Sequence, residues 1–231
     1  MDESMKNVLG IQLNNCTAKE AMQTFMGFME EEQLQVVELA TVDGLMSIME
    51  QEAYSDAIEN FDLVLAGDTT VLETAGIEEK RLLKETKEQT FLKLFLQFLH
   101  KNHKRIYFLG ETEEECTGYY EYFMQRYPGC QIVGVAKLSA KDPADDMVVN
   151  AINGSESDCI LSKLPSPLQE EFIIRNQKLL NARVWLGVGK NPLPGEKNRS
   201  LMVRIGDFIL RSLFKKEISK RKKNIAKENQ K

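Results

Sequence analysis

The stretch FDLVLAGDTTVLETAG, residues 61–76, carries an apolar strand directly into a helix. An apolar run at 63–66 ends at Gly67, Asp68 follows at the turn, and a second apolar run begins at Val71. An aspartate in this place can cap the helix, because its carboxylate accepts hydrogen bonds from the first backbone N–H groups. It can equally act as a general base at the end of the strand. The stretch predicts a strand–turn–helix unit and leaves both roles of Asp68 open.

Apolar runs of the same kind recur along the chain, and segments of helical length separate them. The apolar runs are QVVELAT (35–41), FDLVLAG (61–67), RIYFLG (105–110), QIVGVA (131–136), DCILSK (158–163) and RVWLGVG (183–189). The helix-length segments are 17–31, 45–59, about 87–103, 112–126, 143–153 and 166–180. Thr112 with Glu115, and Ser166 with Gln169, have the spacing of helix capping boxes. The alternation predicts an α/β fold: a Rossmann-like, mainly parallel sheet of about six strands with flanking helices.

We divide the chain into an α/β domain at 1–195 and a basic C-terminal helical appendage at 196–231. The stretch KNPLPGEKNRS, 190–200, is rich in helix and strand breakers and marks the boundary. Residues 200–214 predict a helix with one apolar face. The last stretch, KKEISKRKKNIAKENQK, is too basic to pack and predicts a frayed helix or disorder.

Charge is unevenly distributed along the chain. Residues 199–231 hold eleven Lys or Arg against three acids, a net +8, whereas the whole chain carries −5, so residues 1–198 carry −13. Such a tail favours contact with phosphates or with an anionic membrane surface, although a purely solubilising tail has the same composition. The acidic body and the lack of interleaved aromatic residues argue against nucleic acid as the partner.

The remaining composition predicts a cytoplasmic protein. The four cysteines are scattered without CxxC spacing, the N-terminus is polar, and no apolar run reaches about 18 residues. His100 and His103 lack the nearby cysteines or carboxylates of a metal site, so we expect neither a metal nor a cofactor. The oligomeric state is open, and a homo-oligomer is compatible with the sequence.

Polar residues or glycines follow most of the predicted strands. They are Thr41, Asp43, and residues 68–70, 110–112, 163–169 and 187–190. In open α/β sheets, ligands bind at the carboxyl ends of the strands, so these residues indicate where a site would form. The chain contains neither GxGxxG nor a Walker A loop. Because a single such residue is more often a helix cap than a catalyst, only the collection indicates a site.

Several strings, and the order of the elements, resemble the bacterial WecG/TagA/CpsF glycosyltransferases over essentially the whole chain. ATVDGLMSIM resembles a segment around T-P-N, and FDLVLAGDTTV resembles A-D-L-V-x-P-D-G-x-G-V. RIYFLGETEEECTGYYEYFMQRYPGCQIVG follows the pattern R-V-F-L-L-G-G…L-x-x-x-Y-P-x-L-x-I-V-G. DCILSKLPSPLQEEFIIRNQKLL resembles D-I-L-x-V-G-L-x-x-P-x-Q-E-x-W-I-x-x-N, and MVRIGDFILR resembles W-x-R-R-x-G-L-E-W-x-x-R, one residue shorter. The matching polar positions are Thr41, Asp43, Gln169, Glu170, Asn176, Arg204, Asp207 and Arg211.

The resemblance implies an inverting, metal-independent transfer of an N-acetylmannosamine-like sugar. The donor would be a UDP-sugar and the acceptor a sugar linked to polyprenyl diphosphate, in the synthesis of cell wall or surface polysaccharide. A lipid-linked acceptor is met at a membrane, so the resemblance favours a peripheral enzyme on the inner face of the cell membrane. The basic tail would lie on that surface.

Inverting transfer requires a carboxylate that takes the acceptor's proton and cations that balance the departing UDP. We predict Asp68 as the base. The predicted substrate-binding residues are Thr41, Asp43, Thr69, Gly110, Lys163, Gln169, Arg204 and Arg211. Structural alternatives are open for several of them: Gln169 suits a capping box, Lys163 can extend outward to solvent, and the arginines can pair with acids of the body.

The sequence departs from the family pattern at the position of the base. Without a gap, the aspartate of P-D-G falls on Gly67, and Asp68 lies one position later. The G-L-G before the Pro-x-Q-E string has become SKL, and the G-G-A-F-D-x-x-x-G turn has become GKNPLPGEK. These departures favour an alternative: a catalytically degenerate relative that binds a nucleotide sugar or acts as a scaffold.

Overall fold

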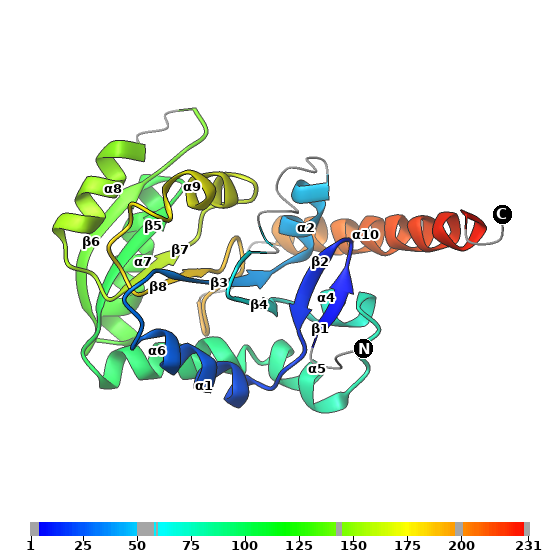
Figure 1. Ribbon diagram of the computed structural model, residues 1–231, viewed down its shortest axis with the longest axis horizontal. Helices are drawn as coiled ribbons and strands as arrows, with labels where there is room; N and C mark the ends of the chain where they lie inside the picture. Colours follow the sequence, from blue (N-terminus) through cyan, green and yellow to red (C-terminus); the bar gives the residue numbers. More distant parts are fainter. Residues whose placement is uncertain (1–4, 50–57, 59, 142–144, 197–200, 229–231) are drawn as a thin grey trace.

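A computed structural model describes residues 5–49, 58, 60–141, 145–196 and 201–228 of the chain. Within these residues the chain forms a six-stranded, fully parallel sheet and a separate antiparallel hairpin (Figure 1). The sheet has the order β4-β3-β8-β7-β5-β6. Its strands are β3 (Gln35–Ala40), β4 (Leu63–Ala66), β5 (Arg105–Gly110), β6 (Gln131–Lys137), β7 (Cys159–Ser162) and β8 (Val184–Gly187). The predicted fold class, an α/β parallel sheet of about six strands with a C-terminal helix, is confirmed.

Helices cover both faces of the sheet (Figure 1). On one face lie α1 (Ala18–Phe28), α6 (Thr90–Lys101) and α7 (Glu113–Arg126), and on the other lie α8 (Asp145–Gly154) and α9 (Leu168–Asn176). The strands supply both layers because successive side chains of a strand point to opposite faces. Val37 of β3 packs with Phe25 and Phe95 on the first face, whereas its neighbour Val36 packs with Trp185 on the second.

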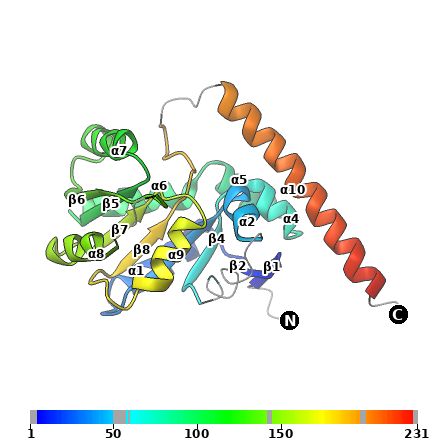
Figure 2. The ribbon, with the colours of Figure 1, turned by 90° about the horizontal axis from the view of Figure 1, so that it is seen from above.

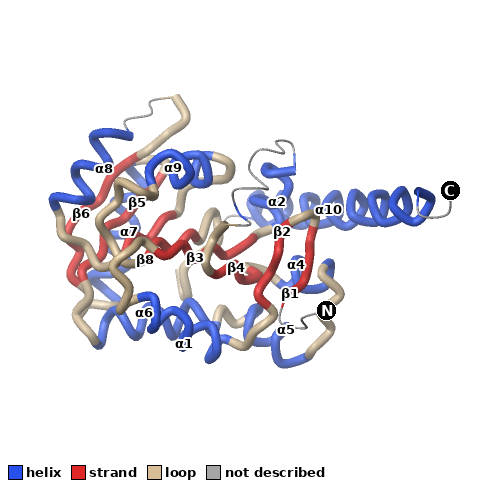
Figure 3. Tube along the Cα trace, in the orientation of Figure 1, coloured by secondary structure: helices blue, strands red, loops and turns tan. Residues whose placement is uncertain are grey.

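A third hydrophobic cluster lies at the β4 edge of the sheet. It joins the hairpin of β1 (Met5–Val8) and β2 (Ile11–Asn14), the short helices α2 (Val42–Met49) and α4 (Thr69–Thr74), and the C-terminal helix α10 (Leu201–Glu228). The Asn14 side chain ties the hairpin to the sheet by accepting a hydrogen bond of 2.8 Å from the Val64 backbone N–H. Figure 3 shows the hairpin beside β4, and Figure 2 shows α10 as one long helix along the side where α2 and α4 lie.

The structure departs from the predicted elements in three places. The hairpin was not predicted, nor was α5 (Lys80–Lys87), whereas the strand–turn–helix unit predicted at 61–76 is present as β4 and α4. The helix predicted at 45–59 begins earlier, at Val42, and most of its second half lies outside the described residues. The capping box predicted for Ser166 and Gln169 is absent: Pro167 occupies the N-cap of α9 without a side-chain hydrogen bond.

The basic tail is a continuous helix to Glu228, so the predicted frayed or disordered stretch is wrong for these residues. Phe214 is fully buried and Ile218 is 7% exposed, and both pack in the third cluster. The Lys215 ammonium also pairs with the Glu73 carboxylate of α4 at 2.8 Å. Two apolar residues one turn apart are sufficient to dock an otherwise basic helix, because its cations remain on the solvent side.

Candidate functional site

The carboxyl ends of four parallel strands surround a cavity of about 900 Å³. The segments that line it follow β3, β4, β7 and β8, and α7 and α10 complete the wall. Its described polar lining residues are Thr41, Asp43, Asp68, Glu114, Glu115, Tyr119, Glu121, Tyr122, Gln125, Arg126, Lys163, Lys190, Asn191, Glu196 and Arg211. Five of the predicted site residues therefore meet here: Thr41, Asp43, Asp68, Lys163 and Arg211.

Asp68 is the N-cap of α4, so its capping role is confirmed. Its Oδ1 accepts hydrogen bonds from the backbone N–H groups of Thr70 at 2.8 Å and Val71 at 3.2 Å. Its Oδ2 accepts a third, of 3.1 Å, from the N–H of Val42 at the start of α2. One carboxylate thus joins the N-termini of two helices, where the helix dipoles favour negative charge. These bonds fix the carboxylate at the cavity wall.

Thr41 and Asp43 reach the cavity from the first turn of α2. The Thr41 Oγ1 accepts a hydrogen bond of 3.0 Å from the Gly44 N–H, which caps the helix. Asp43 is exposed. A Cβ atom on Gly44 would lie 3.0 Å from the Ser166 Oγ and 3.2 Å from the Thr41 Oγ1, so a glycine here lets the α2 turn approach the loop before α9.

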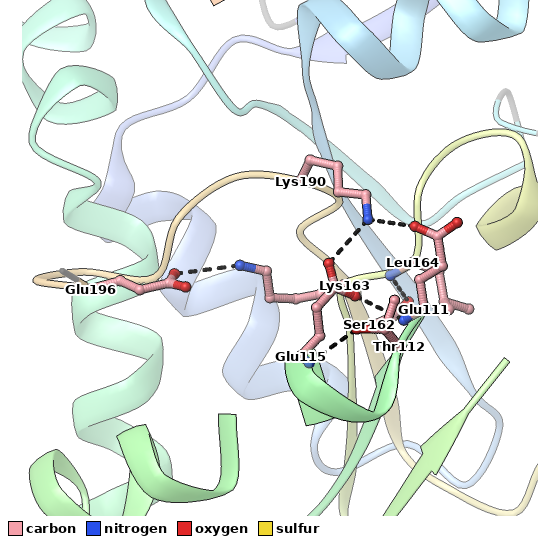
Figure 4. Close-up of polar contacts among 8 residues, drawn as sticks. All are labelled: Glu111, Thr112, Glu115, Ser162, Lys163, Leu164, Lys190 and Glu196. Carbon is pink, nitrogen blue, oxygen red and sulfur yellow. Dashed lines mark hydrogen bonds and ion pairs between the residues drawn. The ribbon is translucent and has the colours of Figure 1, made fainter. Parts of the chain in front are cut away.

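Two lysines line the cavity after β7 and β8, each beside carboxylates (Figure 4). Lys163, directly after β7, has a side chain only 5% exposed and pairs with Glu196 at 3.4 Å. Its ammonium also lies 4.8 Å from the centre of the Tyr119 ring. The interpretation of Lys163 as a side chain that extends to solvent is therefore wrong. Burial of a lysine head is costly unless anions or aromatic faces compensate, and both are present here.

Lys190, on the loop after β8, is clamped by two carboxylates from the start of α7. Its ammonium donates to Glu111 at 2.6 Å and to Glu115 at 3.1 Å. Burial alone would lower the pKa of Lys190, but the hydrogen bonds to Glu111 and Glu115 outweigh it and raise the pKa. Lys190 is thus a permanent cation at neutral pH.

The loop that carries Lys190 and Glu196 is fixed by contacts from elsewhere in the fold. The Tyr122 hydroxyl donates to the Pro194 carbonyl at 2.9 Å, and the Gln89 side chain donates to the Pro192 carbonyl at 2.8 Å. Within the loop itself, the Leu193 N–H donates to the Glu196 Oε2 at 2.6 Å. This loop stands where the resemblance places a glycine-rich turn. It packs against α7 through Tyr122.

Gln169 is not among the described residues that line the cavity. It is fully buried beneath α2, and its Nε2 donates to the Glu38 Oε2 at 2.7 Å. The adjacent Glu170 is also fully buried and accepts a bond of 2.8 Å from the Ser166 hydroxyl. Burial, and then the nearby Glu170, raise the pKa of Glu38 well above its ordinary value; burial also raises the pKa of Glu170. Both groups are therefore held towards their neutral form.

The other predicted site residues are placed elsewhere or are not fully described. Thr69 begins α4, and Gly110 ends β5, where a Cβ atom would lie 2.9 Å from the Cys116 Sγ; neither is among the described lining residues. Arg204 belongs to α10, but its side chain lies outside the described residues. Arg211 is exposed and lines the cavity.

Gly67 occupies a position with no room for a side chain. A Cβ atom there would lie 2.7 Å from the Asn191 Nδ2, 3.0 Å from the Ala40 carbonyl oxygen and 3.1 Å from the Leu39 carbonyl oxygen. The Asn191 side chain in turn donates to the Gly67 carbonyl at 3.3 Å. Asn191 also lines a second, smaller cavity of about 60 Å³ beneath the loop. The space beside residue 67 is therefore filled by a carboxamide from the loop after β8.

The site contains polar residues that sequence reasoning did not select. They include Tyr119, Lys190, Asn191 and Glu196. Lys190 was noted only as a residue at a strand end, and its position next to the Gly187–Gly189 turn is the signal that could have identified it. The others depend on contacts between segments more than 30 residues apart, such as the pair of Lys163 and Glu196.

Comparisons with known proteins agree with this architecture. The model of the glycosyl transferase WecG/TagA/CpsF family matches residues 6–191. Similar curated proteins include two called N-acetylglucosaminyldiphosphoundecaprenol N-acetyl-beta-D-mannosaminyltransferase, from Staphylococcus aureus strains MRSA252 and NCTC 8325 / PS 47. Each is 22% identical over 185 residues, which are 79% of this chain and 72% of the relative. Among the described helices, none has the length and apolar character needed to cross a membrane.

Proposed function

Because the chain belongs to the WecG/TagA/CpsF family of glycosyl transferases, we propose that it moves an N-acetylmannosamine-like sugar from a UDP donor to a lipid-linked acceptor. The printed names of the staphylococcal relatives support this acceptor class, since they describe transfer to a sugar on undecaprenyl diphosphate. The step would serve the synthesis of cell wall or surface polysaccharide. Its site is the cavity at the carboxyl ends of β3, β4, β7 and β8.

One observation carries the proposal: the cavity joins a fixed carboxylate, Asp68, to cations on its other walls, Lys163 and Arg211. An acceptor hydroxyl attacks the anomeric carbon of the donor sugar from the side opposite UDP, and its proton passes to Asp68. The bond between the anomeric carbon and the diphosphate oxygen breaks, and its electron pair leaves with UDP. Lys163 and Arg211 balance that charge, so in this proposal the transfer is inverting and needs no metal ion.

The hydrogen bonds of Asp68 are compatible with a second role as base. Each carboxylate oxygen can accept about two hydrogen bonds. The described bonds use two at Oδ1 and one at Oδ2, which leaves Oδ2 able to accept the acceptor hydroxyl. Thr41 and Asp43, in the adjacent turn, are then placed to bind the sugar.

Gly67 favours a second candidate function, a degenerate relative that binds the nucleotide sugar without turnover. The family pattern has its aspartate at this position, and here the Asn191 carboxamide lies within 2.7 Å of any Cβ atom. Such a protein would retain Lys163 and Arg211 as diphosphate contacts. It would lack a competent base.

Release of UDP separates the two candidates. The protein is incubated with UDP-N-acetylmannosamine and N-acetylglucosamine linked to undecaprenyl diphosphate, and UDP is measured with a coupled assay. We expect release by the wild-type chain and loss of release, by roughly 10²- to 10⁴-fold, in Asp68→Asn. Asp43→Asn should retain most of the activity, because Asp43 positions the sugar and takes no proton.

Two results would decide against this mechanism. If UDP-sugars bind but no free UDP is formed with any donor in a panel, the degenerate relative is supported. UDP release that persists in Asp68→Asn would remove Asp68 as the base while leaving the transferase activity intact.

We also propose that α10 brings the protein to the inner face of the membrane. Its distal half presents Lys216, Lys220, Arg221 and Lys223, which are exposed, and each cation near anionic headgroups contributes about 1 kcal/mol. Sedimentation with vesicles should therefore require anionic lipid and weaken in the triple variant Lys220→Gln, Arg221→Gln, Lys223→Gln. Equal binding to neutral vesicles would contradict this role.

A further inference from the structure

Two hydrogen-bond donors converge on one carboxylate oxygen of Glu196, a residue that lines the cavity. The Lys163 ammonium lies 3.4 Å from the Glu196 Oε2 (Figure 4). The Leu193 N–H donates to the same oxygen at 2.6 Å. An ammonium and a backbone N–H that share one focus are the components of an anion-binding site. In this structure the anion is the carboxylate of the protein itself.

The two partners of this ion pair differ in how firmly they are held. The Lys163 side chain is 5% exposed, whereas that of Glu196 is 37% exposed. Lys163 also retains its contact with the Tyr119 ring, whatever anion accompanies it. The separation of 3.4 Å is longer than the 2.7–2.9 Å typical of strong N–H⁺···O⁻ bonds. The carboxylate is therefore the exchangeable member of the pair, and the ammonium is the fixed one.

The charged residues that line the cavity determine how easily a diphosphate can enter it. Among the described lining residues, six are acids (Asp43, Asp68, Glu114, Glu115, Glu121 and Glu196) and four are bases (Arg126, Lys163, Lys190 and Arg211). A diphosphate that entered beside all six carboxylates would meet net repulsion. If the diphosphate replaces Glu196, it binds the Lys163 ammonium and the Leu193 N–H, and the Glu196 carboxylate moves away from it.

We propose that Glu196 holds the place of a phosphate group at Lys163 and Leu193, and that the diphosphate of the nucleotide displaces it on binding. The inference rests on the proposed function, which puts a nucleoside diphosphate in this cavity. Glu196 then sets the donor affinity: it keeps the buried ammonium neutralised in the free protein, and its displacement is part of the binding free energy.

Calorimetric titration with UDP, and separately with inorganic pyrophosphate, tests the exchange. A competitor that is removed no longer opposes the ligand, so Glu196→Gln should bind both ligands about tenfold more tightly than wild type. Glu196→Asp keeps the charge but shortens the reach to Lys163, and it should also bind more tightly. Thermal unfolding verifies that each variant is folded.

Two controls separate displacement from a general change of charge. Glu121→Gln removes an exposed carboxylate from the same cavity, and it should change the affinity by less than about threefold. In a protein that already carries Lys163→Met, Glu196→Gln should no longer increase the affinity for UDP or pyrophosphate by much, because the cation that the phosphate would bind is absent. Equal gains in Glu121→Gln and Glu196→Gln would overturn the inference.

The failure of the inference and the failure of the proposed function are distinguishable. Wild-type protein that binds UDP, with Glu196→Gln binding it equally or more weakly, overturns the exchange and leaves the transferase proposal standing. Absence of UDP binding in wild type and in every Glu196 variant removes both. UDP binding that appears only when Glu196 is replaced supports the exchange.

Discussion

The two sides of the cavity hold their charges in different ways. At the β4 side, the Asp68 carboxylate is bound by three backbone N–H groups from two helices. At the β7–β8 side, Lys163 and Lys190 are matched by the side-chain carboxylates of Glu196, Glu111 and Glu115. Three backbone N–H groups from two helices hold the Asp68 carboxylate, whereas the Glu196 carboxylate is 37% exposed, accepts from one backbone N–H, and can rotate away from Lys163.

Under the proposed function, this difference suits the two sides to different tasks. A base must stand at a fixed point relative to the acceptor, and a carboxylate held by helix N-termini meets that need. A diphosphate site must receive and release an anion at each turnover, and ion pairs between side chains allow exchange.

The fixed side can be divided into its structural and chemical roles. Asp68→Asn and Asp68→Ala should both lower UDP release by roughly 10²- to 10⁴-fold, since neither can take a proton. Asparagine still caps α4, but its amide cannot accept from Val42 N–H, and alanine loses all three bonds. The free energy of unfolding, measured with urea, should therefore be highest for wild type, lower for Asp68→Asn and lowest for Asp68→Ala. The alanine variant should lie about 1–2 kcal/mol below the asparagine variant. Equal stability of all three proteins would remove the capping role.

The wall formed by α10 depends on one aromatic side chain. Phe214 is fully buried, and its truncation to alanine should lower the free energy that holds α10 on the body by about 3–5 kcal/mol. Tryptic cleavage of the basic tail, followed by mass spectrometry, should then accelerate strongly. The neighbouring Leu213 is 51% exposed, so Leu213→Ala is the matched control and should cleave at nearly the wild-type rate.

Lys163 and Arg211 should contribute unequally to the affinity for UDP. Lys163→Met removes a nearly buried ammonium and should weaken UDP binding by roughly 10- to 100-fold, as expected for a hydrogen bond between charged groups. Arg211 is exposed, so Arg211→Ala should cost less than about tenfold, and its effect should shrink in high salt. Calorimetry at two salt concentrations measures both. A salt-independent loss in Arg211→Ala would show that this side chain is buried by the ligand.

The buried acid Glu38 should make the stability of the protein depend on pH. Its pKa is raised in the fold by burial, so the stability it contributes is fully present below the ordinary pKa and is lost as pH rises through the folded pKa. Glu38→Gln stays neutral and avoids that loss. Its unfolding free energy relative to wild type should therefore rise with pH, by at most about 1.4 kcal/mol per pH unit. Urea unfolding at pH 5, 7 and 9 measures the difference.

The control for this pH effect is Glu113→Gln. The Glu113 side chain is 81% exposed and pairs only loosely, at 3.2 Å, with Lys137. This variant controls for the loss of a surface carboxylate, and it should change the unfolding free energy by less than about 0.5 kcal/mol. Parallel curves for Glu38→Gln and wild type would mean that Glu38 is ionised in the fold.

The parallel sheet could be predicted from the sequence because its strands are buried on both faces. Each of the six apolar runs contains or overlaps one of the six strands, from β3 to β8. The hairpin escaped prediction because its turn is formed by Leu9 and Gly10, both with positive φ, and leucine is not a residue that signals such a turn. The tail was misjudged because its high charge concealed the spacing of Phe214 and Ile218.

The site was predictable only where it follows the strand ends. Thr41, Asp43, Asp68 and Lys163 come directly after strands, and all four line the cavity. Gln169 also lies near a strand end, but its side chain does not line the cavity. It donates to the Glu38 carboxylate, and Glu38 lies in the middle of an apolar run. A Cβ atom on Gly187 would collide with the Glu38 Oε2 and the Gln169 Nε2, so three segments meet at a point that no local pattern reveals. The family and the enzyme class, predicted from the motifs, are confirmed by the match over residues 6–191.

A crystal structure of the complex with UDP would show where the diphosphate binds. We expect the diphosphate in the cavity of about 900 Å³, within hydrogen-bond distance of the Lys163 ammonium, with the Asp68 carboxylate facing the terminal phosphate across an open space for the sugar. UDP bound outside this cavity, or bound inside it with Lys163 still paired to Glu196 and Asp68 screened from the phosphates, would overturn both the proposed site and the exchange at Lys163.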